Sequence, residues 1–224
     1  MQWILFDIDG TLLNSSGAGG RAMYAAVNKV FGSELKLGSV PFHGRTDRSI
    51  ITDILKLNDI ECDDKTFSDV AEVYLEHLAE ELATAENKVF PGVMDLLKDL
   101  TKFSDLRIGI LTGNMKAGAE LKLKYFEIED HFELGFYGDH FPTRNLLSQS
   151  ARDFISEKDG GKFVASDIWI IGDTPADIEC GRHIGAQVLA VSTGGSSYPE
   201  LEKHKPDILV ESLEDSKEFL SLLA

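Results

Sequence analysis

Short, almost wholly apolar runs recur along the sequence, and segments with helical periodicity lie between most of them. The runs are residues 1–6, 106–111, 133–137, 167–171, 187–191 and 207–210. They lack the polar alternation of half-exposed strands, which is typical of parallel strands covered on both faces. Helical patterns occupy residues 92–103, 116–125, 144–155 and 175–184. This alternation predicts an α/β fold with a doubly wound, parallel, Rossmann-like sheet and right-handed crossovers.

The interval between the first apolar run and Pro91 breaks this alternation, because it shows helical periodicity and no convincing strand. Apolar residues recur at helical spacing over residues 23–31 and again over residues 67–82. Asp63 or Asp64 can cap the second helix. We therefore predict a small helical cap domain (15–88) inserted into a core of residues 1–14 and 89–224, over the strand ends. Alternatively, these helices simply pack on the sheet.

The composition indicates a folded domain that does not bind polyanions. The chain has 224 residues, 43% of them hydrophobic, which is enough for a core without disulfides. Lysine and arginine number 22 against 38 acidic residues, a net charge of −16, so we expect no nucleic-acid or membrane-surface binding. The sequence shows no signal peptide and no apolar run of membrane-spanning length. Cys62 and Cys180 fit no metal-ligand spacing, and we expect a reducing, cytoplasmic location.

Two carboxylates, Asp7 and Asp9, follow the first apolar run. Side chains two residues apart on a strand point to the same side, so both would face the crevice beyond the strand ends, where ligands of such sheets bind. A divalent cation would keep Asp7 ionised, and Asp9 could then carry a proton, which places a nucleophile beside a general acid. The alternatives are solvated acids at a strand end, or an Asx turn opened by Asp9.

Thr112, Gly113 and Asn114 follow the second apolar run. They supply a hydroxyl, an exposed backbone amide and a side-chain amide at a strand end and helix start, which is a natural anion site. The same residues are also common in turns and helix caps, so this cluster alone leaves both interpretations open.

Asp173 and Asp177 follow the run at residues 167–171, and Pro175 between them suits a first helical turn. Mg²⁺ prefers a few carboxylate oxygens together with water and substrate phosphate. Asp7 and Asp173 could supply those oxygens if their strands are neighbours. The alternative is a helix N-terminus with favourable acidic residues.

The three clusters occur in order, each after an apolar run, and together the sequence resembles the haloacid dehalogenase superfamily of phosphohydrolases. The likeness covers essentially the whole chain and is nearest to phosphoglycolate-phosphatase-like members with a helical cap. It extends to the tail at residues 192–197 and to Pro206-Asp207. The segments that carry it are Asp7-Ile8-Asp9-Gly10-Thr11, Thr112-Gly113-Asn114 and Gly172-Asp173 to Asp177.

The resemblance implies a Mg²⁺-dependent phosphatase for a small organic phosphate monoester. Asp7 would attack phosphorus and form an aspartyl-phosphate, while Asp9 would protonate the leaving alkoxide and then activate water. Mg²⁺ would be bound by the Asp7 carboxylate, the Asp9 backbone carbonyl and Asp173. Asp177 would support the metal directly or indirectly, or orient a basic residue.

The phosphoryl oxygens would be held by Thr112 and by the amides of Gly113 and Asn114. Three alternatives stay open: a metal-independent haloacid dehalogenase, a β-phosphoglucomutase-like phosphosugar mutase, and a non-catalytic binding module. Asp9 argues against the dehalogenase, because departure of a halide needs no proton donor. The expected partner is a small phosphorylated metabolite, and either a monomer or a homodimer fits the sequence.

The sequence departs from the family pattern in its third motif, where a lysine usually precedes proline. Arg144 lies 29 residues before Asp173, at the start of a predicted helix and so near the strand ends. A site with several carboxylates and a phosphate dianion needs such a cation, and arginine can bind phosphate bidentately. The rivals Lys158 and Lys162 lie beside a glycine-rich stretch typical of a surface loop. Alternatively, Arg144 is an exposed helix residue.

Residues 43–47 resemble the substrate loop of the cap. Thr46 or Asp47 would cap a helix that starts there. Arg45 could bind a carboxylate or a second phosphate of the substrate bidentately. The alternative is a surface arginine that balances local acids.

Overall fold

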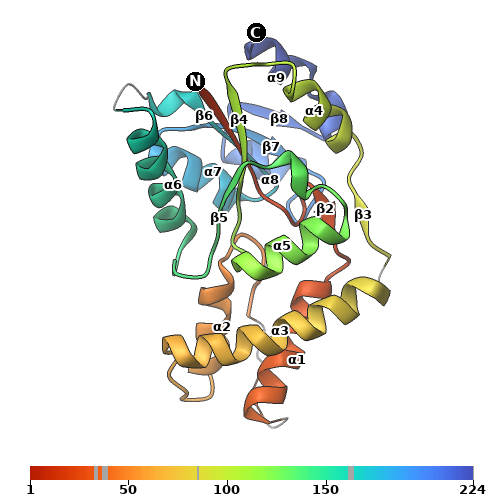
Figure 1. Cartoon of the computed structure of the whole chain (residues 1–224), viewed down its shortest axis with the longest axis vertical. Helices are drawn as coiled ribbons and strands as arrows, with labels where there is room; N and C mark the ends of the chain where they lie inside the picture. Colours follow the sequence, from red (N-terminus) through yellow and green to blue (C-terminus); the bar gives the residue numbers. More distant parts are fainter. Residues whose placement is uncertain (33–34, 37–39, 85, 161–163, 224) are drawn as a thin grey trace.

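The computed structural model describes residues 1–32, 35–36, 40–84, 86–160 and 164–223, and a parallel sheet crosses its centre (Figure 1). The order of its six strands is β5 (Leu134–Phe136), β4 (Leu106–Leu111), β1 (Gln2–Phe6), β6 (Ile168–Gly172), β7 (Gln187–Val191) and β8 (Ile208–Val210). β1 lies between β4 and β6, with all pairs parallel. The residues that follow these three strands therefore meet at one edge of the sheet. The predicted α/β fold with a doubly wound parallel sheet is confirmed.

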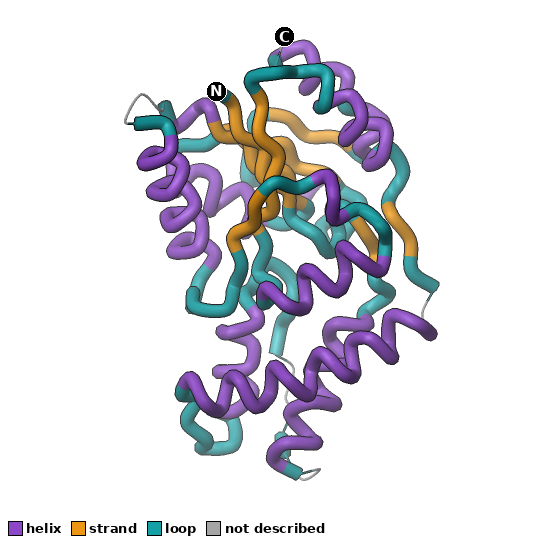
Figure 2. The backbone as a smooth tube through the Cα atoms, viewed as in Figure 1, coloured by secondary structure: helices purple, strands orange, loops and turns teal. Residues whose placement is uncertain are grey.

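Helices cover both faces of the sheet, because successive side chains of each strand point to opposite faces. In β1, Ile4 and Phe6 contribute to one apolar cluster, whereas Trp3 and Leu5 contribute to another. The first face carries α4 (Val93–Leu100), α5 (Lys116–Tyr125) and α9 (Lys217–Leu222); the second carries α6 (Arg144–Lys158), α7 (Pro175–Ile184) and α8 (Tyr198–Lys203). Figure 2 shows the strands enclosed between these helical layers.

A further group of helices lies beyond the carboxyl ends of the strands (Figures 1 and 2). It comprises α1 (Ala18–Phe31), α2 (Asp47–Lys56) and α3 (Asp64–Thr84). These helices bury their apolar side chains mainly in a cluster of their own rather than on the sheet. We call them the helical cap. Its status as a separate domain stays a prediction.

The chain enters the helical cap through β2 (Leu13–Asn14) and leaves it through β3 (Lys88–Val89), which pair antiparallel. The expectation that no strand lies between β1 and Pro91 is therefore wrong at both ends of the interval. Strands of two residues are too short to leave a periodic pattern in the sequence. The predicted boundaries at residues 14 and 89 fall in this pair.

The helical cap is docked on the loops at the sheet edge. Thr46 caps α2 by accepting a hydrogen bond from the Ser49 amide at 3.2 Å. The next amide, of Asp47, donates to the Gly113 carbonyl oxygen at 2.7 Å. In return, the amide of Met115 donates to the Asp47 carboxylate at 2.8 Å. These bonds join the amino ends of α2 and α5.

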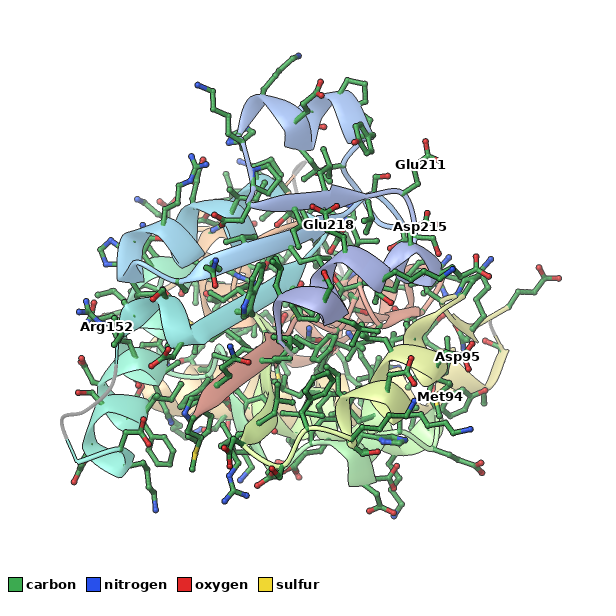
Figure 3. All side chains as sticks on the ribbon, turned by 90° about the horizontal axis from the view of Figure 1, so that it is seen from above. Met94, Asp95, Arg152, Glu211, Asp215 and Glu218 are labelled. Atoms are coloured by element: carbon green, nitrogen blue, oxygen red, sulfur yellow. The ribbon has the colours of Figure 1, made fainter. Side chains whose placement is uncertain are left out.

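The outer surface is strongly acidic where α4 and α9 cover the sheet. Figure 3 shows Asp95, Glu211, Asp215 and Glu218 around these two helices, and all four are exposed. None of the helices in the described ranges is both long and apolar enough to cross a bilayer.

Candidate active site

A cavity of about 390 Å³ lies between the carboxyl edge of the sheet and the helical cap. The three clusters of polar residues that follow β1, β4 and β6 reach it or its wall, because these strands are adjacent in the sheet. From the helical cap, the amino end of α1, the loop before α2 and Tyr74 of α3 line the opposite side. The cavity therefore brings together residues from both parts of the chain.

Asp7, Asp173 and Asp177 form a buried carboxylate cluster in which one oxygen from each lies within 4.8 Å of the others. Asp7 Oδ1 is buried and accepts no hydrogen bond from the described residues. Burial, opposed by the charge of Arg144 and reinforced by Asp177, raises the pKa of Asp7 to about 6. The electrostatics of this cluster therefore favour a cation beside Asp7.

Asp173 is held in place by a side-chain hydroxyl and a backbone amide from segments that follow two other strands. Its Oδ1 accepts a hydrogen bond from the Thr11 hydroxyl at 3.2 Å, and its Oδ2 accepts one from the Gly195 amide at 2.9 Å. Gly10 has a φ of +90°, and a Cβ there would overlap the Asp173 carboxylate. Burial raises the pKa of Asp173 well above its ordinary value, and the carboxylates of Asp177 and Asp7 add to this.

Arg144, the first residue of α6, is buried and lies inside this cluster. Its Nη2 pairs with Asp177 Oδ1, and its Nη1 lies 3.4 Å from Asp7 Oδ1. Burial would lower the pKa of the guanidinium, but the charges of Asp177 and Asp7 outweigh it and raise that pKa. Of its rivals, Lys158 is exposed at the end of α6, and Lys162 lies outside the described residues.

Asp177 is occupied by contacts of its own, since its Oδ2 accepts hydrogen bonds from the Thr174 amide at 3.0 Å and hydroxyl at 2.7 Å. With Oδ1 paired to Arg144, both oxygens have partners. One of these partners is the Arg144 cation, whereas both partners of Asp173 are neutral. The contacts therefore favour the interpretation in which Asp177 orients the basic residue over the one in which it binds the metal directly.

Asp9 lies on the other side of the cavity in a hydrogen-bond network centred on Lys122 of α5. The Lys122 ammonium donates to Asp9 Oδ2 at 2.5 Å and to Asn114 Oδ1 at 2.6 Å. The Asn114 amide and the Ser15 hydroxyl also donate to Asp9, each at 2.9 Å. Burial alone would raise the pKa of Asp9, but Lys122 and these hydrogen bonds outweigh it and lower the pKa.

Thr112, Gly113 and Asn114 lie at the end of β4, as predicted, and all three line the cavity. Thr112 Oγ1 accepts a hydrogen bond from the Asn114 side chain at 2.9 Å. The Gly113 carbonyl oxygen accepts a hydrogen bond from the Asp47 amide. A Cβ on Gly113 would overlap the Arg45 backbone, so glycine permits this close approach of the helical cap.

Arg45 lines the cavity, but its guanidinium is partly engaged within the helical cap. Nη2 pairs with Asp53 at 2.7 Å and donates to the Ser49 carbonyl at 3.2 Å. Its proposed contact with substrate stays a prediction.

Sequence reasoning missed Lys122, although a signal was present. Met115, Ala119, Lys122 and Leu123 recur at helical spacing and are all buried. A lysine in an apolar stripe needs a buried partner, and here the partner is Asp9. Asp47 was assigned only to helix capping, yet it also accepts the Met115 amide across the cavity wall.

The carboxylate cluster fits a divalent metal ion. Among the described residues Asp7 Oδ1 is buried without a hydrogen-bond partner, and the pKa values of Asp7 and of the neighbouring Asp173 are both raised. Their oxygens are the hard ligands that Mg²⁺ prefers. The residues that would hold the ion are Asp7, the Asp9 backbone carbonyl and Asp173.

The fold and the cavity together define a doubly wound α/β enzyme class with carboxylates at the central strand ends and helices above them. A family model described as haloacid dehalogenase-like hydrolase matches residues 4–191, and the chain belongs to this family. The predicted superfamily and the predicted enzyme class, a hydrolase, are confirmed.

Individual relatives match over nearly the whole chain. Pyrophosphatase PpaX of Bacillus mycoides is 24% identical over 222 residues, covering 97% of this chain and 96% of its own length. A predicted phosphoglycolate phosphatase from Haemophilus somnus is 20% identical with a TM-score of 0.72, covering 98% and 97% of the two chains. CbbY from Rhodobacter sphaeroides, in complex with phosphate, is 17% identical with a TM-score of 0.75, covering 97% and 96%. The two solved structures share the fold.

Proposed function

We propose that this hydrolase is a Mg²⁺-dependent phosphatase that cleaves a small organic phosphate monoester through an aspartyl-phosphate on Asp7. One observation carries the proposal: Asp7 belongs to a buried carboxylate cluster beside Arg144, at the wall of a cavity that also contains Thr112 and Asn114. This arrangement supports a phosphoryl site in which Asp7 is the nucleophile and cations and hydrogen-bond donors surround the phosphoryl group.

In this mechanism a substrate dianion bound beside Asp9 raises the pKa of that carboxylate, so Asp9, ionised in the free enzyme, takes up a proton from solvent. The Asp7 carboxylate then attacks phosphorus, the bond to the leaving oxygen breaks, and Asp9 gives that oxygen the proton. Asp9 then takes a proton from water, which attacks the aspartyl-phosphate and releases phosphate and free Asp7. When bound at Asp7, the Asp9 carbonyl and Asp173, Mg²⁺ would neutralise charge on the transferring phosphoryl group.

The remaining polar residues hold the phosphoryl oxygens and the reacting groups. Thr112 and the amides of Gly113 and Asn114 donate to those oxygens, and Arg144 adds a fixed positive charge oriented by Asp177. Lys122 and Asn114 hold the Asp9 carboxylate toward the cavity. Arg45 binds the end of the substrate that does not react.

The relatives suggest two substrates to test first. They include a pyrophosphatase and a predicted phosphoglycolate phosphatase, so pyrophosphate and phosphoglycolate head the list. A phosphosugar mutase is the second candidate, because CbbY, which shares this fold, was also solved in complex with xylulose-1,5-bisphosphate, a sugar phosphate. A dehalogenase gains no support from the Lys122 network around Asp9, since halide loss needs no proton transfer.

Steady-state assays with p-nitrophenyl phosphate and a panel of phosphorylated metabolites test the proposal. We expect turnover with Mg²⁺, loss of turnover with a chelator, and a phosphoryl adduct on Asp7 in acid-quenched peptides analysed by mass spectrometry. Hexose phosphates rearranged rather than hydrolysed would favour the mutase. Turnover that is indifferent to the chelator would contradict the role of the metal.

The setting of the reaction follows from the same proposal. We expect a cytoplasmic enzyme, supported by the free thiols of Cys62 and Cys180. Its partner would be a small phosphorylated metabolite rather than nucleic acid or membrane, in keeping with the net charge of −16. It would act as a monomer or a homodimer.

A further inference from the structure

The amino end of α1 opens into the cavity with unused hydrogen-bond donors. α1 has 14 residues and no acidic side chain in its first turn, and Gly17, Gly19 and Gly20 line the cavity. The Ala18 amide donates to the Ser15 carbonyl at 2.8 Å. Within the described ranges, the next two amides, of Gly19 and Gly20, have no acceptor. Such an end carries a partial positive charge.

Tyr74 of α3 independently points to a ligand at the same place. Its side chain is 1% exposed and lines the cavity, and its hydroxyl makes no hydrogen bond to the part of the chain that the structure describes. A Cβ placed on Gly19 would lie 3.6 Å from this hydroxyl. Burial and the charges of Asp47 and Asp9 raise the pKa of Tyr74 well above its ordinary value, so the hydroxyl keeps its proton and can donate.

Lys122 supplies a full positive charge beside both features. Two of its three ammonium donors are taken by Asp9 and Asn114. The same Cβ on Gly19 would lie 3.4 Å from Lys122 Nζ. The third donor is therefore within reach of a group bound between α1 and Tyr74.

We propose that the amino end of α1, the Tyr74 hydroxyl and the Lys122 ammonium form a subsite for an anionic group, a carboxylate or a phosphate, on the leaving-group side of the substrate. The side is fixed by Lys122, which contacts Asp9, the proton donor to the leaving oxygen, and not the cluster around Asp7. The inference rests on the proposed phosphatase function and narrows its substrate class to compounds with a second negative charge.

Two acidic side chains, Asp9 and Asp47, also line this part of the cavity, and Asp9 is paired with Lys122. Asp47 is the one without a cation paired to it among the described residues. Its Oδ2 already accepts the Met115 amide. Burial raises the pKa of Asp47 to about 6, although the charge of Lys122 opposes this shift. The ionised form of Asp47 is therefore destabilised in the folded protein. The free hydrogen-bond donors around Gly19, which are two backbone amides, the Tyr74 hydroxyl and one ammonium proton of Lys122, therefore outnumber the acceptor that Asp47 still offers.

Matched pairs of substrates test the subsite with the full-length enzyme and Mg²⁺. 2-Phosphoglycolate is compared with 2-hydroxyethyl phosphate for the carboxylate, and pyrophosphate with methyl phosphate for the phosphate. We expect kcat/KM to be higher for the anionic member of at least one pair, and that pair identifies the anion. Tyr74→Phe removes only the hydroxyl, and we expect it to lower the preference about tenfold or more, mainly through KM.

Two further variants keep the test decisive. Gly19→Ala places a methyl group between the proposed donors, and we expect it to lower the same preference while alanine favours the helix. Tyr125→Phe, on the exposed side of α5, is the matched control and should keep the wild-type ratio. If wild type, Tyr74→Phe and Gly19→Ala all show the same ratio of kcat/KM between the anionic and the neutral substrate of a pair, the subsite is wrong. The proposed phosphatase function would not be affected by that result. No turnover of any of the four substrates would contradict the proposed function, and the subsite with it.

Discussion

Asp7 and Asp9 are two residues apart, yet the protein places them in opposite electrostatic environments. Asp7 belongs to the cluster with Asp173 and Asp177, and its pKa is raised to about 6, with burial as the main cause. Asp9 has the Lys122 ammonium at 2.5 Å, and its pKa is lowered although burial opposes this. One strand end thus carries a carboxylate whose charge is only partly compensated, Asp7, and one with a cation of its own, Asp9.

The difference lies in how each nearby cation is shared. Arg144 pairs with Asp177 and stands 3.4 Å from Asp7, so Asp7 receives only part of its charge. In the described part of the chain Lys122 donates to no second carboxylate, since its other hydrogen-bond partner is the neutral Asn114. The cluster around Asp7 is therefore where an added divalent cation lowers the energy most, and an ionised Asp9 is ready to take a proton from water.

The largest expected effect comes from neutralising Asp7. Asp7→Asn removes the attacking oxygen's charge and should lower kcat by about four powers of ten or more while the fold is retained. Steady-state kinetics and circular dichroism check this. Activity within tenfold of wild type would show that Asp7 is not the nucleophile.

Arg144 is the next test, because it is the cation on the Asp7 side. Arg144→Ala should lower kcat/KM by about a hundredfold or more, and Arg144→Lys should keep part of the activity. Arg152→Ala is the control, since Arg152 lies on the same helix α6, at the outer edge of the molecule (Figure 3), and does not line the cavity. If Arg152→Ala lowers kcat/KM as much as Arg144→Ala does, the loss comes from a disturbed helix α6 and not from the missing positive charge at Arg144.

Lys122 tests the Asp9 side of the comparison. Lys122→Met removes the charge that opposes burial, so the pKa of Asp9 should rise. The acidic limb of the kcat pH profile, which reports ionised Asp9 activating water, should therefore move to higher pH. Activity at neutral pH should fall by about tenfold or more. Lys122→Arg should keep the limb near its wild-type position. An unmoved profile in Lys122→Met would remove Asp9 from the rate-limiting proton transfer.

Asp47 is a third buried carboxylate and behaves like Asp7, with a pKa raised to about 6 from 3.8. A raised pKa in the folded state means that folding binds protons, so its contribution to stability falls as pH rises through about 4 to 6. Asp47→Asn keeps an acceptor for the Met115 amide without the charge. The variant should be about 1–2 kcal/mol more stable than wild type at pH 7 and about equal at pH 4. Thermal unfolding at both pH values measures this, and a variant less stable at pH 7 would contradict it.

Arg45 should give the smallest effect, because Asp53 already holds its guanidinium. Arg45→Ala should cost less than about tenfold in kcat/KM, and more for an anionic metabolite than for p-nitrophenyl phosphate. Equal changes with both substrates would remove Arg45 from substrate binding.

The six strands of the parallel sheet could be predicted from the sequence. So could the place of the carboxylates Asp7, Asp9 and Asp173 directly after these strands. Buried parallel strands leave continuous apolar runs, and the residues that follow them stand next to those runs in the chain. Arg144 is predicted from the resemblance to the family's third motif, by its distance of 29 residues before Asp173 and its place at the start of a predicted helix. The structure has it as the first residue of α6. The strands β2 and β3, with two residues each, carry too little pattern to be seen.

What only the tertiary structure decided is which charges meet. Lys122 reaches Asp9 across 113 residues of sequence, Asp47 reaches Met115 across 68, and Arg144 reaches Asp177 across 33. Periodicity reports which face of a helix is buried, but it does not report what lies opposite that face. These pairings depend on how α2, α5 and α6 sit against the sheet edge, so the electrostatic difference between Asp7 and Asp9 is a property of the packed molecule.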